Sequence, residues 1–202
     1  MKTTIGAVAL TAVLAAGGAG AGMIAAVPAA GAVATSSTSA VLLSANVPAQ
    51  ALQPWPVLKQ GSNTGWPLVT VRSLQYLLNA HGAKLPVTGT FGAKTKAAVV
   101  AFQKAHHLTA DGVAGAATWR ALLVTCHKGS TGPAVRAVQD QINFRNNKNG
   151  HTLNVDGIYG PKTEAAVRAF QAAMRHEIPK FPVDGIVGPL TWQALVTEAL
   201  SG

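Results

Sequence analysis

The chain has 202 residues, of which 11% are charged and 49% are hydrophobic, with 16 Lys and Arg against 7 Asp and Glu. This length suits one or two ordinary domains, and the formal charge of +9 favours anionic partners without choosing among nucleic acid, acidic lipid and acidic polymers. A single cysteine, Cys126, excludes an intramolecular disulfide, so stability must come from a packed core, in which we expect this thiol to be buried or inert.

Residues 1–34 have the order of a secretory signal peptide. Lys2 precedes an apolar stretch, and Ala32-Val33-Ala34 offers a cleavage site of the A-x-A kind. A retained transmembrane anchor is the alternative, but glycines interrupt the centre of the Ala/Gly tract and disfavour a helix there. We therefore predict an exported protein. Residues 35–54, rich in Ser, Thr, Ala and Pro, are predicted to be a flexible linker.

The remainder of the chain repeats itself in matching blocks. The matched segments are 71–75 with 135–139, 87–95 with 155–163, 98–103 with 166–171, and 111–119 with 184–192. The offset between partners grows along the chain, and the extra residues fall between blocks, as is typical of surface loops that join structural elements. We predict two repeats, over residues 55–124 and 125–202.

Apolar residues within the blocks follow helical spacing. The stripes include Val71, Leu74 and Leu78 in one block, Ala166, Phe170 and Met174 in another, and Trp192, Leu195 and Val196 in the last. Steps of three and four residues indicate amphipathic helices, whereas strands would alternate. The predicted fold is all-α, with two tandem three-helix bundles after the signal peptide and the linker.

Glycine-containing turns separate the predicted helices. The pairs are Asp111-Gly112, Asp156-Gly157 and Asp184-Gly185. Glycine permits a positive φ, and an aspartate can accept hydrogen bonds from backbone amides that follow it. Pro161 and Pro189 suit the first position of a helix, where no N–H is needed. We expect these aspartates and glycines to form turns and to have no catalytic role.

Together the blocks form a pattern that occurs twice: G…V…LQ…L…DG-x-[FY]-G…T…AV…FQ…DG-x-x-G…TW…L. It resembles the three-helix peptidoglycan-binding domain. The resemblance implies peptidoglycan as the partner, an extracellular location associated with the cell wall, and no cofactor. Repeat one departs from the pattern, because Thr88-Gly89 replaces the first Asp-Gly and Ala93 and Ala116 replace the prolines. If only one repeat binds, we expect it to be the second.

A binder of peptidoglycan needs an aromatic surface for sugar faces and a cation for stem-peptide carboxylates. The candidate ligand-binding residues are Phe91, Lys94, Trp119, Tyr159, Lys162 and Trp192. Core packing is the preferred interpretation of the rings and simple solvation that of the lysines, with ligand contact as the alternative for both. Four glutamines recur beside core positions and are expected to bond loop backbone in preference to a sugar: Gln75, Gln103, Gln139 and Gln171.

Catalytic and metal-binding signatures are missing from the sequence. The histidines have no ligand spacing, so no metal site is predicted, and there is no G-x-S-x-G motif. Glu164 and Glu177 are too isolated to suggest a glycosidase pair. We therefore predict that the protein is not an enzyme.

The leading hypothesis is a secreted, monomeric, non-catalytic protein that binds peptidoglycan through two modules, with anionic wall polymers as further partners. Two linked weak sites raise the apparent affinity through effective concentration. The main alternative is a targeting or interaction subunit that docks a separate wall hydrolase or wall-assembly protein, and a cryptic hydrolase is a third. Nucleic acid is disfavoured because the basic residues are dispersed and export is predicted.

Overall fold

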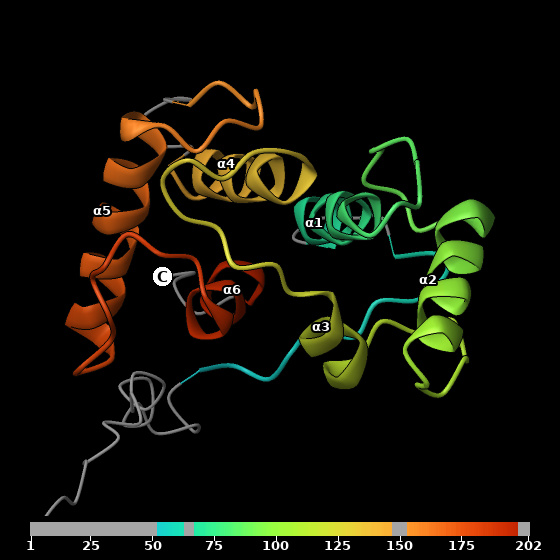
Figure 1. The fold of residues 1–202 in the computed structure, drawn as a ribbon. Coiled ribbons are helices and arrows are strands. Elements are labelled where there is room, and N and C mark those ends of the chain that lie inside the picture. Colours follow the sequence, from blue (N-terminus) through green and yellow to red (C-terminus); the bar gives the residue numbers. More distant parts are fainter. Residues whose placement is uncertain (1–51, 63–66, 147–152, 198–202) are drawn as a thin grey trace, which may run out of the picture. The chain divides into compact units, whose positions relative to one another are not determined.

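The structure is a computed structural model that describes residues 52–62, 67–146 and 153–197. Within these ranges the secondary structure is helical, apart from isolated bridges, which confirms the predicted all-α class. The helices are α1 (Pro67–Ala80), α2 (Ala93–Ala105), α3 (Ala116–Leu122), α4 (Pro133–Arg145), α5 (Pro161–Glu177) and α6 (Pro189–Val196). Each predicted repeat thus contributes three helices (Figure 1). The predicted signal peptide and most of the predicted linker lie outside the described residues.

Each repeat begins with a short extended segment that crosses the loop before its third helix. In repeat one the bridge joins Leu58 to Ala114, and in repeat two it joins Cys126 to Val187, both antiparallel. Cys126 therefore takes the place of Leu58. Its thiol is free and only 1% exposed, as expected, and burial raises its pKa to about 12. A buried thiol held in its protonated form is an inert part of the core.

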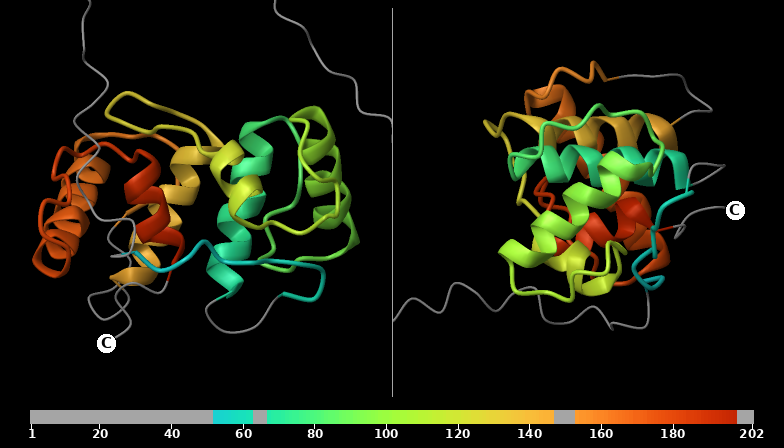
Figure 2. Two further views of the ribbon diagram at one scale, coloured as in Figure 1. Left: turned by 90° about the horizontal axis from the view of Figure 1, so that it is seen from below. Right: turned by 90° about the vertical axis from the view of Figure 1, so that its right-hand side faces the viewer.

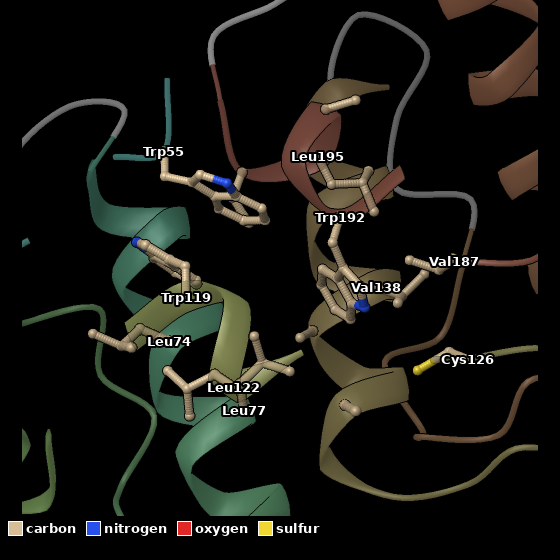
Figure 3. Packing of buried hydrophobic residues seen from close by; sticks show 14 of the residues in the cluster. Trp55, Leu74, Leu77, Trp119, Leu122, Cys126, Val138, Val187, Trp192 and Leu195 are labelled. Carbon is tan, nitrogen blue, oxygen red and sulfur yellow. The ribbon is translucent and has the colours of Figure 1, made fainter. Parts of the chain in front are cut away.

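One tryptophan lies at the centre of each repeat. Trp119 and Trp192 are fully buried, and their indole Nε1 atoms donate to Pro56 O at 2.7 Å and Val124 O at 2.8 Å. Figure 3 shows Trp192 beside Val138 and Val187, with Trp55 above Trp119. Trp55 stacks on Trp119 with ring centroids 6.2 Å apart. Both indoles thus join the entry segment of their repeat to its third helix.

The repeats pack against each other through α1 and α4, which lie side by side with α2 and α5 on opposite outer sides of the pair (Figure 1 and Figure 2). Arg72 on α1 forms a two-pronged ion pair with Asp140 on α4, at 2.7 and 3.0 Å. The buried Gln141 Nε2 donates to Ser73 Oγ at 2.9 Å. Apolar side chains of both repeats belong to one continuous core.

The described residues before 55, where the first repeat was predicted to start, already contact the folded repeats. Leu52 is buried, and Gln53 O accepts a hydrogen bond from Gln193 Nε2 on α6 at 2.9 Å. The last residues of the predicted linker are therefore in contact with the folded repeats.

Candidate functional site

Four loops between consecutive helices share one hydrogen-bonded unit. In each, a buried glutamine accepts from a glycine N–H and donates to a loop carbonyl and to a threonine hydroxyl near the start of the next helix. The glutamine, glycine and threonine sets are Gln75/Gly89/Thr95, Gln103/Gly112/Thr118, Gln139/Gly157/Thr163 and Gln171/Gly185/Thr191. The prediction that these glutamines bond loop backbone is confirmed. They stiffen the loops that carry the exposed residues of the site.

The aspartates and glycines predicted to form turns do so. Each of Asp111, Asp156 and Asp184 accepts the amide two residues ahead at 2.9 Å. The following glycines, Gly112, Gly157 and Gly185, have φ of 73°, 77° and 73°. The Ile158 N–H, helped by the Gln139 amide, lowers the pKa of Asp156, and Val113 N–H with Gln103 lowers that of Asp111. The turn itself thus favours the ionised form of Asp111 and of Asp156.

The aromatic part of the predicted site lies in the core. Phe91, Trp119 and Trp192 have no exposed surface, and Tyr159 is 1% exposed. The Tyr159 hydroxyl donates to Gly185 O at 2.8 Å, and burial raises its pKa. The expectation that these rings offer a platform to sugars is therefore corrected. Their apolar surface faces the bundle, and the polar atoms of Tyr159 and both tryptophans are bonded inside the protein.

The two predicted cations are both exposed, at the second residue of α2 and of α5. Lys162 lines a hollow of about 480 Å³ on repeat two, together with Leu153, Asn154, Asp156 and Ile158. We call this the Lys162 hollow. Lys94 stands at the equivalent place in repeat one. The structure therefore groups Lys162 with the Asp156 turn and separates it from the buried rings.

The Lys162 hollow combines an apolar patch with polar groups. Ile158 is 57% exposed, so a large aliphatic side chain contributes apolar surface to the hollow. Asn154, also exposed, supplies amide donors and an acceptor, and Lys162 supplies a cation. Such a surface can contact the apolar face of a sugar while pairing with a carboxylate.

Sequence reasoning missed Ile158 and Asn154. A signal for Ile158 was present, because a large aliphatic residue follows Asp-Gly again at Ile186, which is 41% exposed. Isoleucine is found both at core positions and at exposed turn positions, so the residue type alone did not show that Ile158 is exposed. In repeat one the place of Ile158 is taken by Thr90, a smaller and more polar side chain.

Two further properties bear on the class of protein. In the described ranges no three His, Cys, Asp or Glu side chains are grouped as they would be in a metal site. None of the helices found there has the length and apolar character needed to cross a bilayer.

The fold defines a small module of three helices that is present in two tandem copies, the second of which carries the Lys162 hollow. Residues 69–122 and 131–195 match the model of the family described as "Putative peptidoglycan binding domain". The match covers more than half of the chain, which therefore belongs to this family. The resemblance seen in the sequence pattern is confirmed for both repeats.

The relatives include an amidase and a carboxypeptidase. The chain is 30% identical over 172 residues to the N-acetylmuramoyl-L-alanine amidase CwlL of Bacillus licheniformis, covering 70% of this chain and 45% of that protein. It is 50% identical over 52 residues to the zinc D-Ala-D-Ala carboxypeptidase of Streptomyces albus G, covering 24% of this chain and 20% of that protein. A crystal structure of Burkholderia AP3 phage endolysin matches with a TM-score of 0.31 and 25% identity, over 57% of this chain and 38% of the endolysin. The chain spans less than half the length of each of these three.

Proposed function

We propose that this protein is an exported, non-catalytic binder of peptidoglycan, and that the Lys162 hollow of repeat two is its main contact with the polymer. The observation that carries the proposal is the hollow itself, where an exposed aliphatic side chain, an amide and a cation meet on a rigid turn. The family to which both repeats belong supports peptidoglycan as the ligand.

The chemistry of the hollow matches the polymer. A sugar ring has an apolar face that can cover Ile158, and its acetamido group can bond the Asn154 amide. A stem-peptide carboxylate can approach the Lys162 ammonium. An exposed ion pair of this kind contributes only about 0.2–1 kcal/mol, so each module binds weakly and two modules on one chain are needed for retention on the wall.

The absence of catalysis in this proposal is supported by what the carboxylates already do. Three of them, Asp111, Asp156 and Asp184, are bonded within turns. Glu164 pairs with Lys128 and Arg168, and Asp140 pairs with Arg72. A glycosidase or amidase of the general acid–base kind needs a carboxylate directed at the substrate. The carboxylates named here are directed at the protein.

Sedimentation with purified sacculi tests the proposal. The full chain is expected to pellet with sacculi and to remain in the supernatant without them. Ile158→Ser is expected to weaken binding about tenfold, because it removes most of the apolar contact. Lys162→Ala is expected to weaken it about two- to fivefold. Lys180→Ala, an exposed change outside the hollow, is the matched control and is expected to pellet like the wild type.

Equal recovery in the supernatant with and without sacculi would refute peptidoglycan binding. Retention in a pull-down from cell-envelope extract, together with no binding to bare sacculi, would favour the alternative of a subunit that docks another wall protein. Clearing of a peptidoglycan gel by the purified chain would overturn the non-catalytic part.

A further inference from the structure

The two repeats carry very different charge. Residues 55–124 hold seven Lys and Arg but a single acidic residue, Asp111, whereas residues 125–202 hold eight Lys and Arg and six acidic residues. Because Asp111 is bonded within its turn, repeat one has no carboxylate available to neutralise its cations. Most of the excess positive charge of the chain therefore belongs to repeat one.

Two of these cations border a groove along α2. Lys96 and Lys104 are both exposed and line a depression of about 470 Å³, whose floor includes Ala97, Val100 and Ala101. We call this the α2 groove. With a rise of about 1.5 Å per residue, eight residues place the two lysines about 12 Å apart along the helix. The groove thus has an apolar floor between two positive charges.

The position of Lys96 is set by the turn beneath it. A Cβ atom added at Gly112 would come within 2.9 Å of Lys96 Cγ, so the aliphatic stem of this lysine lies directly on the glycine. The ammonium group is thereby carried past the turn and out to solvent. No carboxylate lies within ion-pair distance of Lys96 or Lys104 in the part of the chain that the structure describes.

In repeat two, ion pairs occupy the surface that corresponds to the α2 groove of repeat one. Glu164 stands where repeat one has Lys96, and Arg168 stands where it has Val100. Glu164 pairs with Arg168 at 3.3 Å and with Lys128 at 3.5 Å. The groups that form these ion pairs in repeat two are therefore replaced in repeat one by the unpaired Lys96 and by uncharged residues, among them Val100.

We propose that the α2 groove binds an extended peptide that carries two carboxylates, namely the stem peptide of peptidoglycan; this rests on the proposed function and adds a peptide site in repeat one to the contact at Lys162. An extended chain advances about 3.3–3.6 Å per residue, so 12 Å corresponds to groups three or four residues apart. A stem peptide with an acidic second residue and a free carboxyl terminus has that spacing. Its alanine methyl groups can rest on Ala97, Val100 and Ala101.

A phosphate-bearing polyol polymer of the wall would also satisfy the lysines, but it fits the floor poorly. Its repeating units have few apolar groups with which to cover Ala97, Val100 and Ala101, whereas alanine methyl groups can do so. The apolar floor therefore selects the peptide over the polyol.

Titration of the full chain with the synthetic pentapeptide L-Ala–γ-D-Glu–L-Lys–D-Ala–D-Ala, followed by NMR of backbone amides, tests the proposal. Shifts are expected in α2 from Lys96 to Lys104. The double variant Lys96→Glu/Lys104→Glu is expected to bind the pentapeptide about tenfold more weakly, as two exposed ion pairs turned into repulsion would cause. The control Lys84→Glu/Arg120→Glu changes the net charge equally outside the groove and is expected to bind like the wild type.

The same samples are sedimented with sacculi, which separates this proposal from the function on which it rests. A wild-type chain that pellets with sacculi but shows no pentapeptide shifts in α2 would overturn the stem-peptide site and leave peptidoglycan binding intact. Equal weakening in both double variants would overturn it as well, since the effect would then be one of net charge.

Shifts in α2 with glycerol-phosphate oligomers and none with the pentapeptide would assign the groove to the other polymer. Pentapeptide binding without pelleting would keep the peptide site and refute the wall-binding function.

Discussion

Gln171 illustrates how single residues determine the loops of this protein. Its Nε2 donates to Asp184 Oδ1, Ile186 O and Thr191 Oγ1, at 2.9, 2.9 and 3.2 Å, and its Oε1 accepts from Gly185 N–H at 2.8 Å. The side chain is fully buried. One amide thus joins α5, the turn and the first turn of α6.

Gln171→Met is expected to lower the free energy of unfolding by about 2–4 kcal/mol, because a buried amide N–H and a buried carbonyl lose their partner while the volume changes little. Urea unfolding followed by circular dichroism measures the loss. Gln60→Met, at an exposed glutamine, serves as the control and is expected to change stability by less than about 0.5 kcal/mol. A loss as small as that of the control would show that the glutamine is not needed to hold the turn.

The turn aspartates predict a loss of stability in acid. Turn N–H groups lower the pKa of Asp111 and of Asp156 below 3.8 in the folded chain. A carboxyl whose pKa is depressed by folding stabilises the protein above its unfolded pKa, and this contribution disappears as the pH falls through the folded pKa. We expect the wild type to lose stability below about pH 4, and Asp111→Asn/Asp156→Asn to lose less over that range, in urea unfolding between about pH 2 and pH 6. The same acid loss in both proteins would contradict this assignment.

For single residues, the sequence predicted hydrogen-bond partners better than it predicted which side chains are exposed to solvent. Gln75, Gln103, Gln139 and Gln171 were expected to bond backbone, because each recurs next to a core position and has both a donor and an acceptor. Whether Phe91 and Tyr159 face inward could not be settled, since a ring in a tight turn can point either way. The outcome depends on bonds such as that from the Tyr159 hydroxyl to Gly185 O, which joins residues of different loops.

At the scale of the element, the ends of the third helices depend on side chains from elsewhere. Arg145, at the end of α4, donates from Nη2 to Ala194 O and Leu195 O at 2.8 Å and lies over the Phe170 ring at 5.4 Å. In repeat one His81 holds the corresponding place, with Nε2 3.1 Å from Leu122 O. Such contacts satisfy carbonyls that a helix of 7 or 8 residues leaves without partners.

Arg145→Met keeps the apolar stem but removes these donors. We expect it to lower the free energy of unfolding by about 2–3 kcal/mol, because buried carbonyls at the end of α6 lose charged donors. Faster amide exchange in α6 than in α2 should accompany the loss, since an eight-residue helix is not stable without tertiary contacts. Arg120→Met, at an exposed arginine on α3, is the control. Unchanged exchange in α6 would rule out a capping role for Arg145.

The apolar periodicity of the sequence predicted the helices, but it did not predict how the ends of the helices are capped. The residues before α2, α3, α4, α5 and α6 are glycines, and none of them makes a side-chain capping bond. At the start of α5 the Thr163 hydroxyl accepts from Gln139 Nε2 and donates to Ile158 O at 3.4 Å, so it joins the loop to the helix without capping the helix N–H groups. Such a link between residues 24 positions apart, Gln139 and Thr163, has no local sequence signature.

At the scale of the whole folded part, the contact between α1 and α4 makes the repeats one unit. The repeat pattern does not predict this packing, because Arg72 and Arg136 occupy equivalent positions in the two copies. In the structure Arg136 Nη1 donates to Val155 O within its own repeat, while Arg72 crosses to Asp140. The residue equivalent to Asp140 is Tyr76, so an ion pair can form on only one side. The repeat pattern consists of residues that both copies share. This one-sided ion pair depends on residues that differ between the copies, so the pattern did not predict it.

The polar contact between Ser73 and Gln141 provides a test of how this interface is stabilised. Gln141 Nε2 donates to Ser73 Oγ, but Gln141 Oε1 is buried without a partner among the described residues. The equivalent positions are Ala137 and Leu77, both fully buried. Ser73→Ala alone is expected to lower the free energy of unfolding by about 1–2 kcal/mol, because the whole buried amide then lacks partners.

The double variant Ser73→Ala/Gln141→Leu, by contrast, reproduces on this side of the interface the pair already present on the other. It removes both partners together and leaves no unsatisfied group, so its stability is expected to equal or exceed that of the wild type. Urea unfolding of the wild type, both single variants and the double variant gives the coupling energy, and a single transition in each shows that the repeats still unfold together. A double variant less stable than Ser73→Ala would mean that the polar pair stabilises the contact between the repeats. Recovery would mean that the Ser73–Gln141 hydrogen bond is not needed to hold α1 against α4.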